Sequence, residues 1–257
     1  MDLSLRLSFD REAEKYARSR PAPPGALVRA MLEQGDLTGG TRVLEVGCGT
    51  GQATTPLAQH GLEIHALELG PSLAALARER LAPYPNVIVE QGTFETFTSD
   101  TPFDALISVQ AFHWIEPGFG LSHAASLLHS DGALLLAWHQ DRRQDTAFER
   151  AVDPVYERYE APLQLQRPTP NATAANIVEA LMISPDFYGL RVSSFPWQET
   201  YHGARYLELL TTFSNVQALD TAARRAFLGE IAELVDAYGG SVIRHYESLL
   251  LSARRYP

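Results

Sequence analysis

Ten residues near the start of the chain decide the fold: Val43-Leu44-Glu45-Val46-Gly47-Cys48-Gly49-Thr50-Gly51-Gln52. A short apolar strand ends beside an acid, and glycines then follow at alternate positions before a helix-like run. Glycine lets a backbone turn sharply and approach a ligand closely. The dinucleotide spacing G-x-G-x-x-G is not met, because Gln52 stands where its third glycine would be. The stretch predicts a strand, a ligand-binding turn and a helix.

Strand and helix signals alternate outward from this stretch, as in an α/β fold. Strands are expected at 42–46, 63–69, 86–90, 104–109, 132–138, 190–201 and 241–253. Helices are expected after Thr50 as far as about residue 60, from Pro71 onward, and over 117–128. Pro196 inside a predicted strand indicates a sheet edge or a bulge. Parallel strands with helical crossovers bind ligands at their carboxyl ends, where the candidate site residues lie.

Charge and composition exclude several classes of protein. The 257 residues carry a formal net charge of −10 without a basic run, so nucleic acid is not an expected partner. Cys48 is the only cysteine, which rules out an intrachain disulfide. The start lacks a signal peptide's apolar region, and no apolar run approaches the ~20 residues of a membrane span. We expect a cytoplasmic protein with no membrane segment, and no metal site because the histidines lack ligand spacing. The sequence does not indicate an oligomeric state.

The run from Glu45 to Gly51, read as E-x-G-x-G-x-G, resembles the first motif of class I S-adenosylmethionine-dependent methyltransferases. The resemblance implies a Rossmann-like, doubly wound sheet of seven mostly parallel strands with a helical cap. It also implies S-adenosylmethionine as the cofactor. Residues 1–140 are then the cofactor-binding core with an N-terminal helical lid, and residues 141–257 are the helical cap with the last two strands.

Of two later positions in the chain, one matches the family's pattern and the other departs from it. Glu68 ends the second predicted strand, where the family has an acid that binds the ribose hydroxyls, and a carboxylate can accept from both. An ordinary solvated glutamate is the alternative. The family's Gly-Asp-Ala segment is replaced here by Gln91-Gly92-Thr93-Phe94-Glu95, so the adenine contact passes to Phe94 or to a shifted Glu95.

The segment QAFHWIEP from Gln110 to Pro117 resembles the branch of trans-aconitate methyltransferase-like enzymes. The entry from Phe9-Asp10 through Tyr16 to Arg20-Pro21, and the run from Tyr206 to Ser214, are similar to it as well. This implies that Tyr16 contacts the methionine part of the cofactor, while Arg20 binds the methionine carboxylate or an acidic substrate. The residues expected at the cofactor are Tyr16, Arg20, Glu45, Gly47, Cys48, Gly49, Gly51, Gln52, Glu68, Leu69, Thr93, Phe94, Glu95, Gln110 and Ala111.

The predicted reaction is direct in-line methyl transfer to a small molecule, at oxygen, with carbon and nitrogen acceptors left open. The Asn/Asp-Pro-Pro-Tyr/Phe motif of base-methylating enzymes is absent after the fourth strand. Alignment in a dry pocket carries much of such a reaction. His113 is the candidate general base for a hydroxyl acceptor, and a packed, hydrogen-bonded histidine is the alternative. Acceptor specificity is expected in the cap, over 139–188 and 202–240.

Two other functions remain open on the sequence alone. One is a cofactor-binding protein of the same fold that has lost catalysis, a reading that the replacement at Thr93 keeps open. The other is an NAD(P)-dependent oxidoreductase, against which Gln52 and the lack of a second nucleotide-binding half both count.

Overall fold

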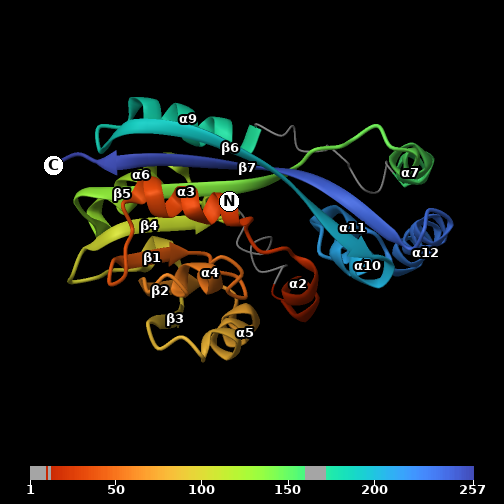
Figure 1. Ribbon diagram of the computed structural model, residues 1–257, viewed down its shortest axis with the longest axis horizontal. Helices are drawn as coiled ribbons and strands as arrows, with labels where there is room; N and C mark the ends of the chain where they lie inside the picture. The colour runs from red at the N-terminus through yellow and green to blue at the C-terminus, as the bar shows by residue number, and fades with distance from the viewer. Residues whose placement is uncertain (1–9, 11–12, 160–171) are drawn as a thin grey trace.

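A single sheet organises the molecule, of which the computed structural model describes residue 10 and residues 13–159 and 172–257. Its strands are β1 (Arg42–Val46), β2 (Glu63–Glu68), β3 (Val87–Gln91), β4 (Phe103–Val109), β5 (Leu128–Asp141), β6 (Phe187–His202) and β7 (Ser241–Arg255). Their order in space is β3-β2-β1-β4-β5-β7-β6 (Figure 1). The first five strands pair in parallel, and β7 runs antiparallel to both β5 and β6. The predicted seven-stranded, mostly parallel sheet is therefore confirmed.

The last strands are longer than the sequence predicts. β5 begins four residues before Gly132, and its pairing with β4 is irregular near that start. Pro196 lies in β6, which is an edge strand as its presence predicts. An edge strand has no neighbour on one side and therefore tolerates a residue without an N–H group. The helix expected after Thr50 is only α4 (Thr54–Ala58), because the turn takes up the residues before it. Phe9 lies outside the described residues.

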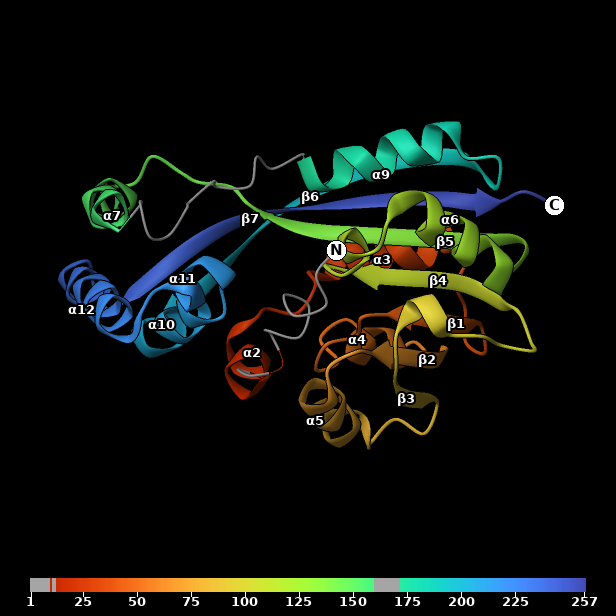
Figure 2. The ribbon, with the colours of Figure 1, turned by 180° about the vertical axis from the view of Figure 1, so that it is seen from behind.

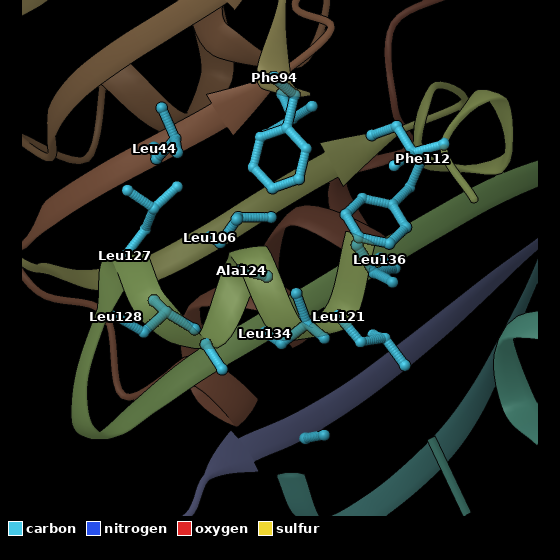
Figure 3. Packing of buried hydrophobic residues seen from close by; sticks show 14 of the residues in the cluster. Leu44, Phe94, Leu106, Phe112, Leu121, Ala124, Leu127, Leu128, Leu134 and Leu136 are labelled. Carbon is cyan, nitrogen blue, oxygen red and sulfur yellow. The ribbon is translucent and has the colours of Figure 1, made fainter. Parts of the chain in front are cut away.

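Helices cover both faces of the sheet (Figure 2). The helices α3 (Gly25–Gly35), α4 and α5 (Pro71–Leu81) pack on one face, and α6 (Pro117–Leu127) and α9 (Ala172–Ile183) on the other. Side chains alternate between the faces, as the twofold period of a strand requires. Leu106 and Leu136 join the α6 side, while Ile107 and Leu135 join the α3 side. Figure 3 shows Phe94 and Phe112 packed among the leucines of the α6 side.

A cap of helices gathers at the far end of β6 and β7, which extend beyond the other strands (Figures 1 and 2). It consists of α7 (Ala147–Arg158), α10 (Gly203–Thr211), α11 (Ser214–Ala218) and α12 (Thr221–Ala237). Tyr201, Phe227 and Ile231 are fully buried in its own apolar core. The helix α9 differs from the sequence-based expectation, because its apolar residues pack on the sheet face beside α6 and not in the cap.

The short helix α2 (Ala13–Ser19) lies between the sheet core and the cap. Arg80 of α5 donates a hydrogen bond to the carbonyl oxygen of Ala17 at 3.2 Å, and Arg205 of α10 donates one to that of Arg18 at 3.4 Å. α2 therefore contacts both halves of the molecule. Across the described ranges, no helix has the length and apolar character to cross a membrane.

Candidate functional site

A cavity of about 1060 Å³ opens at the carboxyl ends of β1, β2, β4 and β5 and continues between α2 and the cap. This is the upper end of the size range of ligand sites, ~300–1,000 Å³. The predicted residues that line it are Tyr16, Arg20, Glu45, Gly47, Cys48, Gly49, Gln52, Glu68, Leu69, Phe94, Gln110, Ala111 and His113.

Three predicted residues are not among those lining this cavity. Gly51 packs over Leu81, where an added Cβ would meet a side-chain carbon at 3.0 Å, so its role is to fit the turn onto α5. Thr93 precedes the short helix η2 (Phe94–Thr96) and shares a hydrogen bond of 2.8 Å with Thr96. Glu95 lies within η2 and is half-buried. Of this segment, Gly92 and Phe94 reach the cavity.

The glycine turn after β1 is built for close approach. Gly47 and Gly49 have φ angles of +74° and +60°, which favour glycine. A Cβ on Gly47 would lie 2.3 Å from the Cβ of Ala111, so a side chain there would collide with the segment after β4. The turn is anchored on β2, because the amide N–H groups of Gly47 and Cys48 both donate to the carbonyl oxygen of Leu67, at 2.8 and 3.1 Å.

Glu68 fastens this turn from the end of β2. Its side chain is 7% exposed, and its two carboxylate oxygens accept from the N–H groups of Gly49 and Gly70, both at 2.8 Å. Burial raises the pKa of Glu68, and these two hydrogen bonds oppose the rise. Each carboxylate oxygen has a second lone pair, so the group can still accept from a ligand.

Glu45 carries a buried polar atom that the protein leaves unsatisfied. The side chain is 1% exposed, and its Oε2 has no hydrogen-bond partner in the described part of the chain. Gln52, on the same turn, likewise has a buried Nε2 without a partner. Burial raises the pKa of Glu45 to about 7. Buried polar groups normally have partners, so this pair of orphaned atoms in the cavity wall indicates a polar ligand.

The segment after β4 holds a strained residue that its sequence does not signal. Gln110 has a φ of +65°, an uncommon conformation for a residue other than glycine. Its backbone N–H donates to the carbonyl oxygen of Ala137 at 2.8 Å, and its side chain donates to that of His139 at 3.2 Å. Two bonds to β5 thus hold this conformation beside Ala111 and Gly47, and such strain often occurs at binding sites.

His113 lies on the next turn, the short helix η3 (Phe112–Trp114). Its Nδ1 accepts a hydrogen bond from the indole N–H of Trp138 at 3.2 Å, and its ring lies 4.9 Å from that of Trp114. Burial lowers the pKa of His113 to about 4. The imidazole is therefore neutral at physiological pH.

At the cap end, arginines and aromatic rings line the cavity. Arg20 donates to the side-chain and backbone oxygens of Thr212 at 3.0 and 3.3 Å, and its guanidinium lies 4.9 Å from the ring of Phe213. Arg244, from β7, pairs with Asp141 at 2.5 Å. Among the described residues, no ion pair with a carboxylate is found for Arg20, whereas Arg142 and Arg244 each have one and Arg143 has two.

Sequence reasoning did not place several of these cap-end residues in the site. The place of Trp138, His139 and Gln140 in the cavity could have been predicted. They lie near the carboxyl end of β5, at the edge of the sheet where ligands bind. Arg244 had no such signal, since it lies near the start of an antiparallel strand. Tyr206 and Phe213 line the cavity as the family-like run suggests. Within the described ranges, no cluster of histidine, cysteine or acidic side chains could hold a metal ion.

Comparisons with known proteins agree with this geometry. Residues 43–132 match the family model described as a methyltransferase domain. An uncharacterized methyltransferase of Mycobacterium tuberculosis is 31% identical over 166 residues, which are 62% of this chain and 65% of the relative. The chain therefore spans just under two thirds of that relative's length. A demethylmenaquinone methyltransferase of Tropheryma whipplei is 28% identical over 60% of this chain and 64% of its own.

Solved structures share the fold over nearly the whole chain. A structure from Anaeromyxobacter dehalogenans, assigned to the type II methyltransferases, has a TM-score of 0.68 at 24% identity and covers 93% of this chain and 99% of its own. A Haemonchus contortus phosphoethanolamine N-methyltransferase, solved with phosphomonomethylethanolamine and S-adenosylhomocysteine, has a TM-score of 0.56 at 15% identity. That match covers 96% of this chain and 58% of the other.

Proposed function

We propose that this chain is a class I methyltransferase that transfers a methyl group from S-adenosylmethionine to an oxygen of a small molecule, since residues 43–132 match the methyltransferase domain and the fold matches that of the structure from Anaeromyxobacter dehalogenans. The observation that carries the proposal is one continuous cavity that joins the glycine turn of the family motif to a polar and aromatic cap. Such a cavity offers a cofactor and a second molecule a shared space.

The glycine-turn end fits the cofactor. Gly47 and Gly49 line it with left-handed backbone that carries no side chain, and Glu68 has lone pairs at the position where the family binds the ribose hydroxyls. Glu45 has an unsatisfied oxygen suited to a cationic or N–H-bearing group, such as the amino group of the methionine part. Tyr16 of α2 also lines this end, with its ring close to Gly49.

The cap end fits the acceptor. Its groups include the guanidinium N–H donors of Arg20 and the imidazole rings of His113 and His139, and N–H donors bind oxygen atoms. Tyr206 and Phe213 add apolar ring surface. The relatives named for demethylmenaquinone and phosphoethanolamine methylation support a small-molecule acceptor, although they do not identify it.

In the proposed reaction, the residues of this chain align the acceptor with the methyl group and exclude water from the cavity. When bound, S-adenosylmethionine supplies an electrophilic methyl group on a positively charged sulfur. The glycine turn and Glu68 fix one end of the cavity, while α2 and the cap close over it. Holding the acceptor oxygen in line with the methyl group supplies much of the rate enhancement, as positioning does in such reactions.

Two experiments separate the proposal from its alternatives, an oxidoreductase and a cofactor-binding protein without catalysis. Calorimetric titration of the protein with S-adenosylmethionine, S-adenosylhomocysteine and NADH is compared for the wild type, Glu68→Ala and Glu63→Ala. Glu63 begins the same strand at its far end and is exposed, so its variant is the matched control. We expect both adenosyl compounds to bind the wild type and Glu63→Ala, and Glu68→Ala to bind them at least tenfold more weakly.

Preferential binding of NADH would overturn the proposal in favour of an oxidoreductase. Release of S-adenosylhomocysteine in the presence of a pool of small acids, phenols and alcohols then separates an enzyme from a cofactor-binding protein. Tight binding with no release against any pool would favour the binding protein.

A further inference from the structure

The contact between Trp138 and His113 determines the chemistry that this histidine can perform. Trp138 is 3% exposed and lies on β5, whereas His113 lies on the turn after β4. The pairing of β4 with β5 brings the two residues together. The indole Nε1 lies 3.2 Å from the imidazole Nδ1. An indole N–H can only donate, so Nδ1 has to be the unprotonated, accepting nitrogen.

The proton of the neutral ring therefore lies on Nε2. Among the described residues, the bond from Trp138 is the one side-chain hydrogen bond found for the His113 ring, which lines the cavity. The rings packed against it belong to Trp114 and Trp138, which do not titrate, and no charged side chain among the described residues contributes to its pKa shift. Burial alone keeps the ring neutral.

We infer that Trp138 is a positioning residue that holds His113 as a hydrogen-bond donor toward the methyl acceptor and withholds it from the role of general base. To accept a proton, His113 would have to break the bond to Trp138 and become a cation in a buried place. This inference rests on the proposed function for the identity of the molecule in the cavity. The tautomer itself does not depend on that function.

A consequence follows for the acceptor. The atom that meets an Nε2–H group has to offer a lone pair, and His113 in this form does not remove a proton from it, so an acceptor oxygen that is already ionised needs no base from this residue. Such an oxygen forms the new C–O bond with its lone pair while the C–S bond breaks and its electron pair stays on sulfur. One negative and one positive charge disappear together, and no proton moves. Oxygens that are ionised in solution, such as those of a carboxylate, meet this requirement.

The test is the nitrogen NMR spectrum of the histidine rings in ¹⁵N-histidine-labelled protein, recorded from about pH 5.5 to about pH 8.5. His113→Gln identifies the His113 signals. In the wild type we expect one neutral form with the proton on Nε2 and no titration across this range. In Trp138→Phe, which keeps an apolar ring but removes the N–H, we expect the two His113 nitrogen signals to move toward each other as both tautomers become populated.

Trp197→Phe is the matched control. It also removes an indole N–H, but one that donates to Ser248 at 2.8 Å beside His139, so the His113 signals should not move. A wild-type His113 with its proton on Nδ1, or one that titrates near pH 6.5, would overturn the inference. So would Trp138→Phe signals identical to those of the wild type. If Trp138→Phe does not fold, the wild-type spectrum alone decides, because it reports the tautomer directly. None of these readouts requires methyl transfer, so a failure here is distinct from a failure of the proposed function.

Discussion

The carboxyl of Glu45 links the stability of the protein to pH. Its pKa is about 7 in the folded state, against a usual value of 4.5, because the side chain is buried. Between these two values the folded state keeps a proton that the unfolded state has lost. The contribution of Glu45 to the free energy of unfolding therefore falls as the pH rises from about 4.5 to about 7, by on the order of 3 kcal/mol, and is level above pH 7. Burial of His113 and His139, which lowers the pKa of each to about 4, contributes in the opposite direction as the pH rises from about 4 to 6.5.

Glu45→Gln should remove this contribution and leave that of the buried histidines, since an amide of the same shape does not titrate in the range. The measurement is urea denaturation of the wild type and Glu45→Gln at pH 5 and pH 7.5. Glu63→Gln, at an exposed position, should keep the wild-type difference between the two pH values. Equal pH dependence in the wild type and Glu45→Gln would show that another group is responsible.

At the scale of single residues, the sequence indicated which residues line the cavity better than it indicated their contacts; their roles toward a cofactor stay predictions. The family motif led to thirteen residues that do line the cavity. The hydrogen bond from Trp138 to His113 could not be predicted, because it depends on the pairing of β4 with β5 and on the turn that follows. The position of Gln110 in left-handed backbone space was equally hidden, since glutamine carries no preference for it.

At the scale of elements, the turn between β1 and α4 depends on Gly47 for two separate reasons. Its φ of +74° costs a side chain about 1–2 kcal/mol, and a Cβ would also collide with Ala111 at 2.3 Å. Gly40 separates these effects, because it has a φ of +85° but no atom within 4 Å of an added Cβ. We expect Gly40→Ala to lose about 1–2 kcal/mol of stability and to bind S-adenosylhomocysteine normally.

Gly47→Ala should lose more stability than Gly40→Ala and should bind S-adenosylhomocysteine at least tenfold more weakly, because the turn has to move away from Ala111. Urea denaturation and calorimetric titration of the two variants measure both effects. Similar losses in both variants would mean that backbone strain alone accounts for Gly47 and that the close approach to Ala111 is unimportant.

The elements themselves were predictable where local pattern dominates. Every strand was expected within a few residues, because apolar runs bounded by turn residues mark buried strands. The extra length of β5, β6 and β7 was not expected, since it arises from pairing among these three strands beyond the rest of the sheet. The place of α9 was missed because its apolar pattern fits a sheet face and a cap core equally well.

At the scale of the whole molecule, α2 connects the two ends of the cavity to each other. Tyr16, on α2, lines the cavity, and the neighbouring Arg20 donates two hydrogen bonds to Thr212 at the end of α10. A helix of seven residues has little stability of its own and depends on such packing. A ligand that contacts Tyr16 at the glycine-turn end should therefore stabilise α2 and, through it, the adjoining face of α10.

Hydrogen exchange followed by mass spectrometry tests this coupling. On addition of S-adenosylhomocysteine we expect slower exchange in the glycine turn, in α2 and in the part of α10 that α2 contacts, because local opening becomes less frequent. The segment of α12 around Arg225 is exposed and is not among the cavity-lining residues, so its exchange rate should stay constant. Glu68→Ala at the same ligand concentration should show little protection anywhere. Protection confined to the glycine turn would mean that cofactor binding and the cap are independent, and that the acceptor end of the cavity is formed before the cofactor arrives.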